Sequence, residues 1–124
     1  MQSAARAAAR QRAKAEGTAD PRAPCYDTPV HVACVRMDFH IPGCRSLKEK
    51  RGVVKRLVER TRARFNVTIA EVADNDLHQR ACVGFAVVGN EVAFVTEVAD
   101  KVRASLRGSG LANVIDDRLE IVTL

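Results

Sequence analysis

Arginine and lysine side chains are concentrated in one stretch of the sequence, where their number and spacing could bind a polyanion. Residues 45–64 carry nine basic and two acidic residues, whereas residues 65–124 carry five basic and nine acidic residues. On a helical wheel, four of the basic residues share one flank, namely Lys48, Arg51, Lys55 and Arg62. Such a row can follow a phosphate backbone, although the same pattern also occurs on a solvated helix face. RNA, DNA and an acidic protein are therefore the candidate partners.

The basic stretch begins at a turn between a strand and a helix. Pro42 and Gly43 end an extended apolar run, because proline lacks an amide hydrogen and glycine turns easily. Ser46 and Glu49 then form the Ser-x-x-Glu pattern of a capping box, in which each side chain accepts the other residue's amide. A helix N-terminus with basic residues around it favours an anion. The candidate nucleic-acid or anion-binding residues are therefore Arg45, Ser46, Lys48, Arg51, Lys55, Arg62 and Arg80.

A second candidate site is a polar edge, which we define as His40, Asp74, Asp76, His78 and Gln79. Imidazole and carboxylate groups near a helix N-terminus would permit metal-assisted hydrolysis of a phosphate ester. The spacing does not support this chemistry, because the sequence has no His-x-x-x-His or Glu-x-x-His pattern. The segment that begins at Asp74 also lacks the glycine and the glutamate that complete a calcium loop. We therefore predict no catalytic residue, no metal ligand set and no cofactor, and we keep the enzyme as an alternative.

The hydrophobic pattern predicts the elements that position these side chains. The expected strands are 30–41, 66–73, 80–88 and 114–124, and the expected helices are 46–65 and 91–107, the second one capped by Asn90. The order β-α-β-β-α-β is typical of an α+β ferredoxin-like plait, a four-stranded antiparallel sheet with both helices on one face. Its strand order, 4-1-3-2, would bring the polar edge to the start of the first helix. Lys50 lies close to the apolar stripe of that helix and would have to extend its ammonium group to the surface.

Length and composition predict the domain organisation. The 124 residues are 47% apolar, which is enough for a single domain, 29–124, preceded by an appendage, 1–28. The appendage could be a disordered basic arm, an organelle transit peptide or translated sequence upstream of the true start, and we favour the last interpretation. No apolar run approaches the roughly 18–20 residues of a membrane span.

The four cysteines favour a reducing compartment, and we expect a cytoplasmic protein. Cys25, Cys34, Cys44 and Cys82 form no Cys-x-x-Cys pair, so a structural zinc site is not expected. Three of them lie in or beside predicted strands, where a free cysteine packs as a small apolar residue. Cys44 is expected in the exposed turn before the first helix.

The strand at 80–88 contains Gly84-Phe85-Ala86, which is similar to the centre of the RNP1 pattern of an RNA-recognition motif. The two later aromatic positions are Val87 and Asn90, so one stacking ring remains where several are needed. A buried apolar strand explains these residues better, and any RNA would contact the first helix rather than the sheet.

Several segments resemble the YlxP-like family of bacterial proteins. They are His40-Ile41-Pro42-Gly43, Ser46-Leu47-Lys48-Glu49-Lys50-Arg51, Arg64-Phe65-Asn66-Val67, Ala70-Glu71-Val72 and Asp76-Leu77-His78-Gln79-Arg80-Ala81. The resemblance runs from about Val32 to the C-terminus. It implies a ferredoxin-like cytoplasmic protein of unknown function, encoded near genes for translation initiation and for a ribosome-binding maturation factor, and it carries over no catalytic residues. The chain differs from the family pattern at Cys44 in the turn and at His78, where the family often has tryptophan.

These observations together predict a non-enzymatic protein that binds RNA through its basic first helix, with ribosomal RNA or a ribosomal subunit as its partner. One alternative is a metal-assisted phosphate-ester enzyme at the polar edge. Another is a homo-oligomeric module that uses the exposed sheet face. Arg36, Asp38 and His40 make that face look polar, which speaks against the oligomer, and the sequence predicts no oligomeric state.

Overall fold

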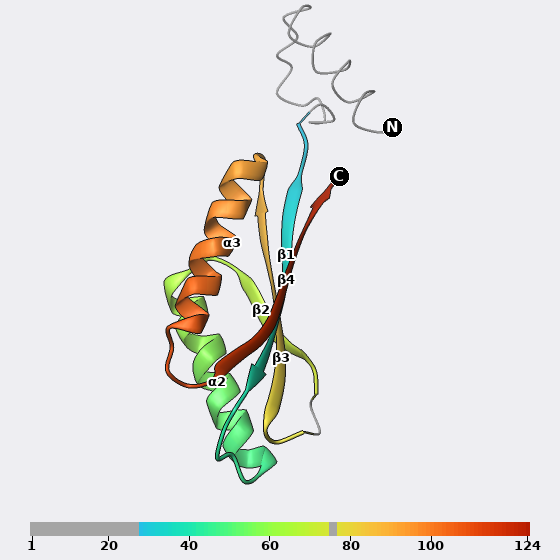
Figure 1. The fold of residues 1–124 in the computed structure, drawn as a ribbon. Coiled ribbons are helices and arrows are strands. Elements are labelled where there is room, and N and C mark those ends of the chain that lie inside the picture. Colours follow the sequence, from blue (N-terminus) through green and yellow to red (C-terminus); the bar gives the residue numbers. More distant parts are fainter. Residues whose placement is uncertain (1–27, 75–76) are drawn as a thin grey trace, which may run out of the picture.

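A computed structural model describes residues 28–74 and 77–124, which form four strands and two helices (Figure 1). The elements are β1 (His31–His40), α2 (Leu47–Arg64), β2 (Thr68–Ala73), β3 (Arg80–Gly89), α3 (Val92–Arg107) and β4 (Asn113–Thr123). This order confirms the predicted β-α-β-β-α-β pattern. The prediction about the appendage lies, except for Thr28, outside the described residues.

The four strands form one antiparallel sheet in the order β2-β3-β1-β4, which is the predicted order. Both helices cover the same face of this sheet, as Figure 1 shows on the left of the molecule. The architecture is therefore the ferredoxin-like plait. The central strands β1 and β3 pair along their whole lengths, from His31 opposite Gly89 to His40 opposite Arg80.

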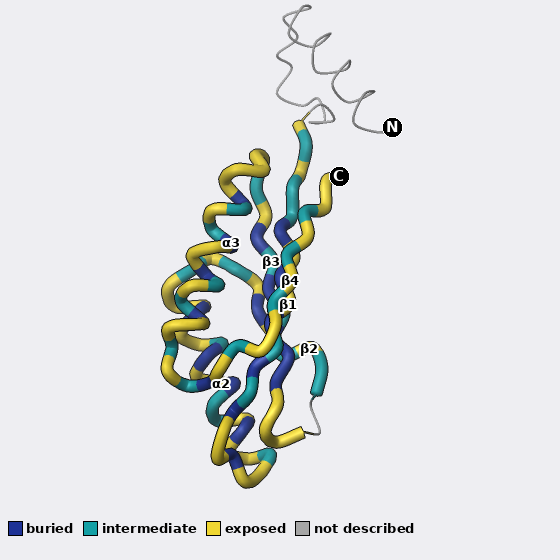
Figure 2. Tube along the Cα trace, viewed as in Figure 1, coloured by how far each residue is buried: buried dark blue, intermediate teal, exposed yellow. Residues whose placement is uncertain are grey.

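The core lies between the helices and the sheet. Alternate residues of the strands point inward, and Figure 2 shows the buried segments along the sheet and on the inner sides of the helices. The largest core side chains from the strands are Met37, Phe39, Ile69 and Phe85, and those from the helices include Leu57, Val95, Val102 and Leu106. Phe85 is thus buried under the helices and cannot act as a stacking ring on the sheet surface.

The start of α3 differs from the prediction. The cap residue is Glu91, not Asn90, and its side chain makes no capping hydrogen bond. The reason lies in the tight connection from β3, which continues to Gly89. A Cβ atom added at Gly89 would lie 2.8 Å from side-chain atoms of Phe94 and Val95, so the first turn of α3 packs directly on this backbone. Within the described residues, neither helix is long and apolar enough to cross a membrane.

Candidate nucleic-acid interface

The N-terminus of α2 is stabilised by the chain's own side chains. The Ser46 hydroxyl accepts a hydrogen bond from the Glu49 amide at 3.1 Å, as the capping box predicts. The Glu49 carboxylate accepts instead from the Arg45 amide, at 2.8 Å, one residue before the predicted partner. A carboxylate therefore already lies at the positive end of the helix dipole. An anionic ligand would depend on the basic side chains of α2 rather than on this helix end.

Four exposed cations form a surface that we call the basic flank, made of Lys48, Arg51, Lys55 and Arg62. The first three lie at steps of about 4.5 and 6 Å along the helix axis. Among the described residues, no carboxylate lies within 4.0 Å of Lys48 or Arg51, and Lys55 is 4.0 Å from Glu59. Such an exposed pair contributes little and leaves Lys55 available.

The basic flank lies beside the edge strand β2. The Arg62 guanidinium donates a hydrogen bond of 3.0 Å to the carbonyl oxygen of Ile69, so this side chain is partly committed to the fold. The opposite flank of α2 faces α3. There, Arg60 and Arg64 line a hollow of about 420 Å³ between the two helices. Arg60 and Arg64 are therefore separated from the basic flank by the helix itself.

Lys50 does not reach the surface, and the expectation that it would do so is wrong. Its side chain is 0% exposed, and its ammonium group lies 2.9 Å from the Glu71 carboxylate of β2. The same group donates a hydrogen bond to the carbonyl oxygen of Asp74. Asp74 has a φ of 60°, a left-handed conformation that turns the chain after β2. Lys50 therefore ties the start of α2 to the β2–β3 connection and contributes no charge to a ligand.

Part of the polar edge comes together where β1 ends and β3 begins. His40 pairs with Arg80 across β1 and β3, and the amide of the next residue, Ile41, donates to the Gln79 carbonyl oxygen at 2.8 Å. The Gln79 amide group also lies 3.5 Å from the Cys44 carbonyl oxygen, just before α2. The remaining members differ, since His78 is exposed, Asp74 bonds to Lys50 through its backbone, and Asp76 lies outside the described residues. Across residues 28–74 and 77–124, no three His, Cys, Asp or Glu side chains are placed to hold a metal ion.

Cys44 is buried rather than exposed, which corrects the prediction. Its side chain is 5% exposed, and its thiol lies 3.4 Å from the carbonyl oxygen of Ser46. The chain folds back here because Gly43 has a φ of 77° and the Cys44 amide bonds to the Ile41 carbonyl oxygen at 3.4 Å. The residue thus packs as a small apolar side chain beneath the start of α2.

Two titratable groups with a shifted pKa lie away from the basic flank. Asp117 of β4 pairs with Arg103 at 3.0 Å and also with Arg107, both on α3. Partial burial opposes ionisation of Asp117, but the hydrogen bonds and charges of these two arginines hold its pKa below the usual range. On the other face of the sheet, burial and then the nearby Asp38 raise the pKa of the Cys82 thiol to about 11. The Asp117 ion pairs tie β4 to α3, and burial keeps the Cys82 thiol neutral, so neither group adds to the basic flank.

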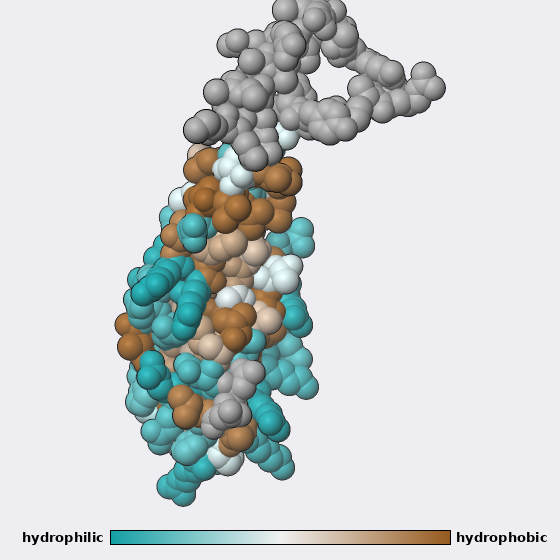
Figure 3. Space-filling model, turned by 90° about the vertical axis from the view of Figure 1, so that its right-hand side faces the viewer, coloured by the Kyte–Doolittle hydropathy of each residue, from teal (hydrophilic) through white to brown (hydrophobic). Residues whose placement is uncertain are grey.

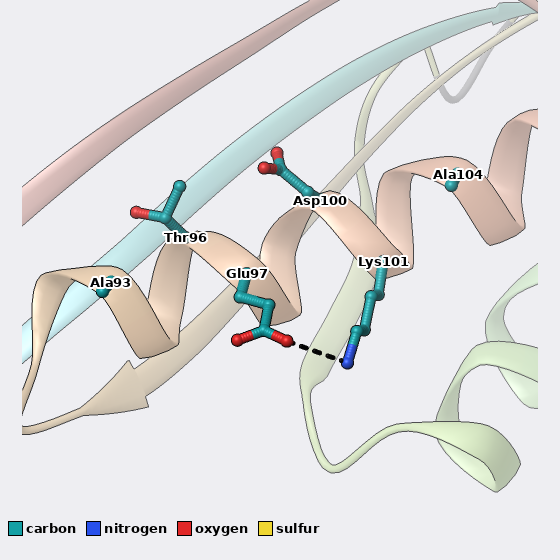
Figure 4. A pocket seen from close by; sticks show the side chains of 6 residues that line it. All are labelled: Ala93, Thr96, Glu97, Asp100, Lys101 and Ala104. Carbon is teal, nitrogen blue, oxygen red and sulfur yellow. Dashed lines mark ion pairs between the residues drawn. The ribbon is translucent and has the colours of Figure 1, made fainter.

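A shallow hollow of about 560 Å³ lies on the outer side of α3 (Figure 4). Its lining residues all come from this one helix, and they are Ala93, Thr96, Glu97, Asp100, Lys101 and Ala104. Glu97 and Lys101 form an ion pair of 3.1 Å across it. Among the described residues, no second element contributes a side chain to this hollow, so it lacks polar groups that converge on a ligand from several directions.

Comparison with known proteins identifies the family. The family model described as "Protein of unknown function (DUF503)" matches residues 32–118. The uncharacterized protein YlxP of Bacillus subtilis (strain 168) is 47% identical over 45 residues, which are 36% of this chain and 49% of that protein. The chain thus spans about half the length of this curated relative. A de novo designed protein, Foldit4, aligns with a TM-score of 0.44 and 12% identity over 77% of this chain and 96% of its own. Because the family match extends from β1 into β4, this chain belongs to the DUF503 family of YlxP-like proteins.

Proposed function

We propose that this protein binds RNA through the basic flank of α2, in the context of a ribosomal subunit in the cytoplasm, and that it catalyses no reaction. The observation that carries this proposal is the row formed by Lys48, Arg51 and Lys55 on one side of a rigid helix. Side chains in such a row can contact successive phosphates of one strand without a change in the fold.

Two neighbouring groups extend this surface toward the polar edge. Arg45 and Arg80 are both exposed at the end of the molecule where α2 begins. Among the described residues, the guanidinium group of neither arginine forms an ion pair with a carboxylate within 4.0 Å, although the Arg45 backbone amide donates to Glu49. The surface therefore offers cations from the helix and from the sheet end to the same polyanion.

The expected salt dependence follows from the number of contacts. If the basic flank and Arg45 each neutralise one phosphate, the slope of log affinity against log salt should be about −3.5 to −4.5. Each contact that is removed should reduce the steepness of the slope by about 0.7–0.9. Arg62 is hydrogen-bonded to Ile69, so its removal could disturb β2 and is left out of the decisive variant.

The test is co-sedimentation of the full chain with purified ribosomal subunits across a salt series. One variant carries Lys48→Glu, Arg51→Glu and Lys55→Glu, and the matched control carries Arg56→Glu, Arg60→Glu and Arg64→Glu on the opposite flank. Both variants change the net charge equally on the same helix. Saturable binding that is lost in the first variant and kept in the control supports the proposal. Equal loss in both variants, or no binding by the unaltered chain at low salt, overturns it.

A further inference from the structure

None of the described helices or strands covers the face of the sheet opposite α2 and α3, and this face is apolar along β3 and at one end. From Cys82 to Val88, no residue of β3 is charged or polar in its side chain except for the cysteine thiol. Its inward positions meet the helices, whereas no described element packs over its outward positions, Cys82, Gly84, Ala86 and Val88 (Figure 1). Of these four, Cys82 is buried by neighbouring side chains and Val88 is the most exposed. An antiparallel strand with one solvated face normally alternates apolar and polar residues. A strand that is apolar on both sides indicates that both sides are covered.

One end of this open face carries large apolar side chains. Val88, Val32 and Val122 lie in register across β3, β1 and β4. Val30 and Leu124 extend the same end, joined by two backbone hydrogen bonds of 3.2 and 2.9 Å. Val88 is 65% exposed although it lies on a central strand. Figure 3, which looks onto this face, shows the hydrophobic surface gathered at its upper end. We call these five residues the apolar end.

Part of the middle of the open face is flat because its side chains on β2, β3 and β1 are small, whereas Arg36, Arg118 and Glu120 lie in the same rows toward β4. Ala70, Gly84, Ala86 and Cys34 lie side by side over β2, β3 and β1. A Cβ atom added at Gly84 would lie 3.1 Å from the side chain of Val72, which is itself exposed. A surface of this shape allows a second sheet to approach to the usual spacing of about 10 Å.

The charges on the open face are of both signs and are arranged in rows. Arg36 lies opposite Arg118, and in the next row Asp38 lies opposite Asp116. Like charges directly opposite one another destabilise a sheet. One oxygen of Asp38 is buried and accepts no hydrogen bond from the described residues, although it lies 3.7 Å from the Nε of Arg36 in the same chain. A second copy carries the same two rows, so its arginines can pair with these aspartates in addition to the Arg36–Asp38 pair within each chain. The two arginines and the two aspartates carry no net charge, so these rows do not attract a nucleic acid.

We propose that the open face of the sheet is the interface of a homodimer, in which two copies pack sheet against sheet. Four strands about 4.8 Å apart and roughly 33 Å long cover about 600 Å² in plane, before side-chain relief is added. A stable interface buries about 600–1,000 Å² on each partner, so the face has the area that a dimer needs. The apolar end and the small central residues supply the hydrophobic contact. The charges of both signs determine how the two copies are positioned relative to each other.

This dimer leaves the helices on its outer sides. The basic flank of each copy stays accessible, and the assembly would present two such surfaces pointing away from each other. The inference does not depend on RNA binding. A monomer that binds ribosomal subunits would overturn only the dimer, and a dimer that binds none would overturn only the proposed function.

The first test is the mass of the full chain in solution, measured by multi-angle light scattering over a concentration series without RNA. We expect twice the chain mass of 13.5 kDa. Val88→Glu should weaken dimerisation at least tenfold, because the charge would be buried on a central strand. The matched control is Val92→Glu on α3, where the valine is 46% exposed but does not lie on the sheet. Circular dichroism establishes that both variants fold.

The second test uses Cys34 as a reporter, because it is exposed on β1 near the centre of the open face while Cys44 and Cys82 are buried. In a Cys25→Ser background, the rate of maleimide modification at Cys34 should fall as the protein concentration rises through the dimerisation range. A monomeric chain at high concentration overturns the proposal. Protection of Cys34 that does not depend on protein concentration also overturns the proposal, because it would mean that residues 1–27 of the same chain shield this cysteine. A dimer that Val88→Glu leaves intact also overturns it.

Discussion

The burial of Lys50 leads to a prediction about stability that separates this residue from the other cations of α2. Lys50→Met keeps the length of the side chain but removes the group that pairs with Glu71 and bonds to Asp74. Removing one partner of a buried ion pair costs about 3–5 kcal/mol. The Glu71 side chain is 20% exposed and keeps some hydration, so we expect the lower figure of about 2–3 kcal/mol. For a domain of this size, that loss lowers Tm by about 10–20 °C.

The assay is urea unfolding followed by circular dichroism, with Lys48→Met as the matched control. Lys48 is exposed two residues away on the same helix, so its replacement should change the free energy of unfolding by less than about 0.5 kcal/mol. The double variant Lys50→Met/Glu71→Leu should recover part of the loss, because it also removes the carboxylate left without a partner. If Lys50→Met is as stable as the unaltered chain, Lys50 faces solvent and the placement of α2 on the sheet is wrong.

Three further outcomes follow from single contacts. Arg103 helps to lower the pKa of Asp117, so the stability that this carboxylate provides is present above about pH 4, the ordinary pKa of an aspartate, and is lost as the pH falls below it. Asp117→Asn should therefore unfold more easily at pH 7, and in thermal melts its Tm should fall less steeply as the pH is lowered. Because the pKa of Cys82 is raised, the contribution of the protonated thiol to the free energy of unfolding is complete below about pH 9 and is lost as the pH rises toward 11. In Cys82→Ala, the free energy of unfolding should fall less steeply over this pH range. Cys82 in the unaltered chain should react slowly with iodoacetamide at pH 8. Gly89→Ala places a Cβ atom 2.8 Å from the fully buried Val95, so it should destabilise the chain by about 1–3 kcal/mol in urea unfolding, and an unchanged midpoint would contradict this packing.

The candidate site could be predicted in outline because its main features are local. The position of the basic flank follows from a period of 3.6 residues, and Ser46 caps α2 because a serine before a helical pattern accepts the amide of Glu49. The gathering of His40, Gln79 and Arg80 follows once the strand order is known. The capping box predicts that the Glu49 carboxylate accepts from the Ser46 amide, but it accepts from the Arg45 amide instead. The Ser-x-x-Glu pattern does not distinguish between these two neighbouring amides.

The sequence by itself determined the order of the elements, the order of the strands and the helix that carries the basic flank, because hydrophobic periodicity and turn residues act over a few neighbouring positions. Only the tertiary structure decided which charged side chains stay in water and which face of β3 is left open. Lys50 is buried because Glu71, from a strand later in the chain, lies where its ammonium group can reach it. The open face has an apolar strip along β3 because this strand has apolar side chains on both sides while both helices pack on one side. The residue alternation along a single strand does not show which side the helices cover.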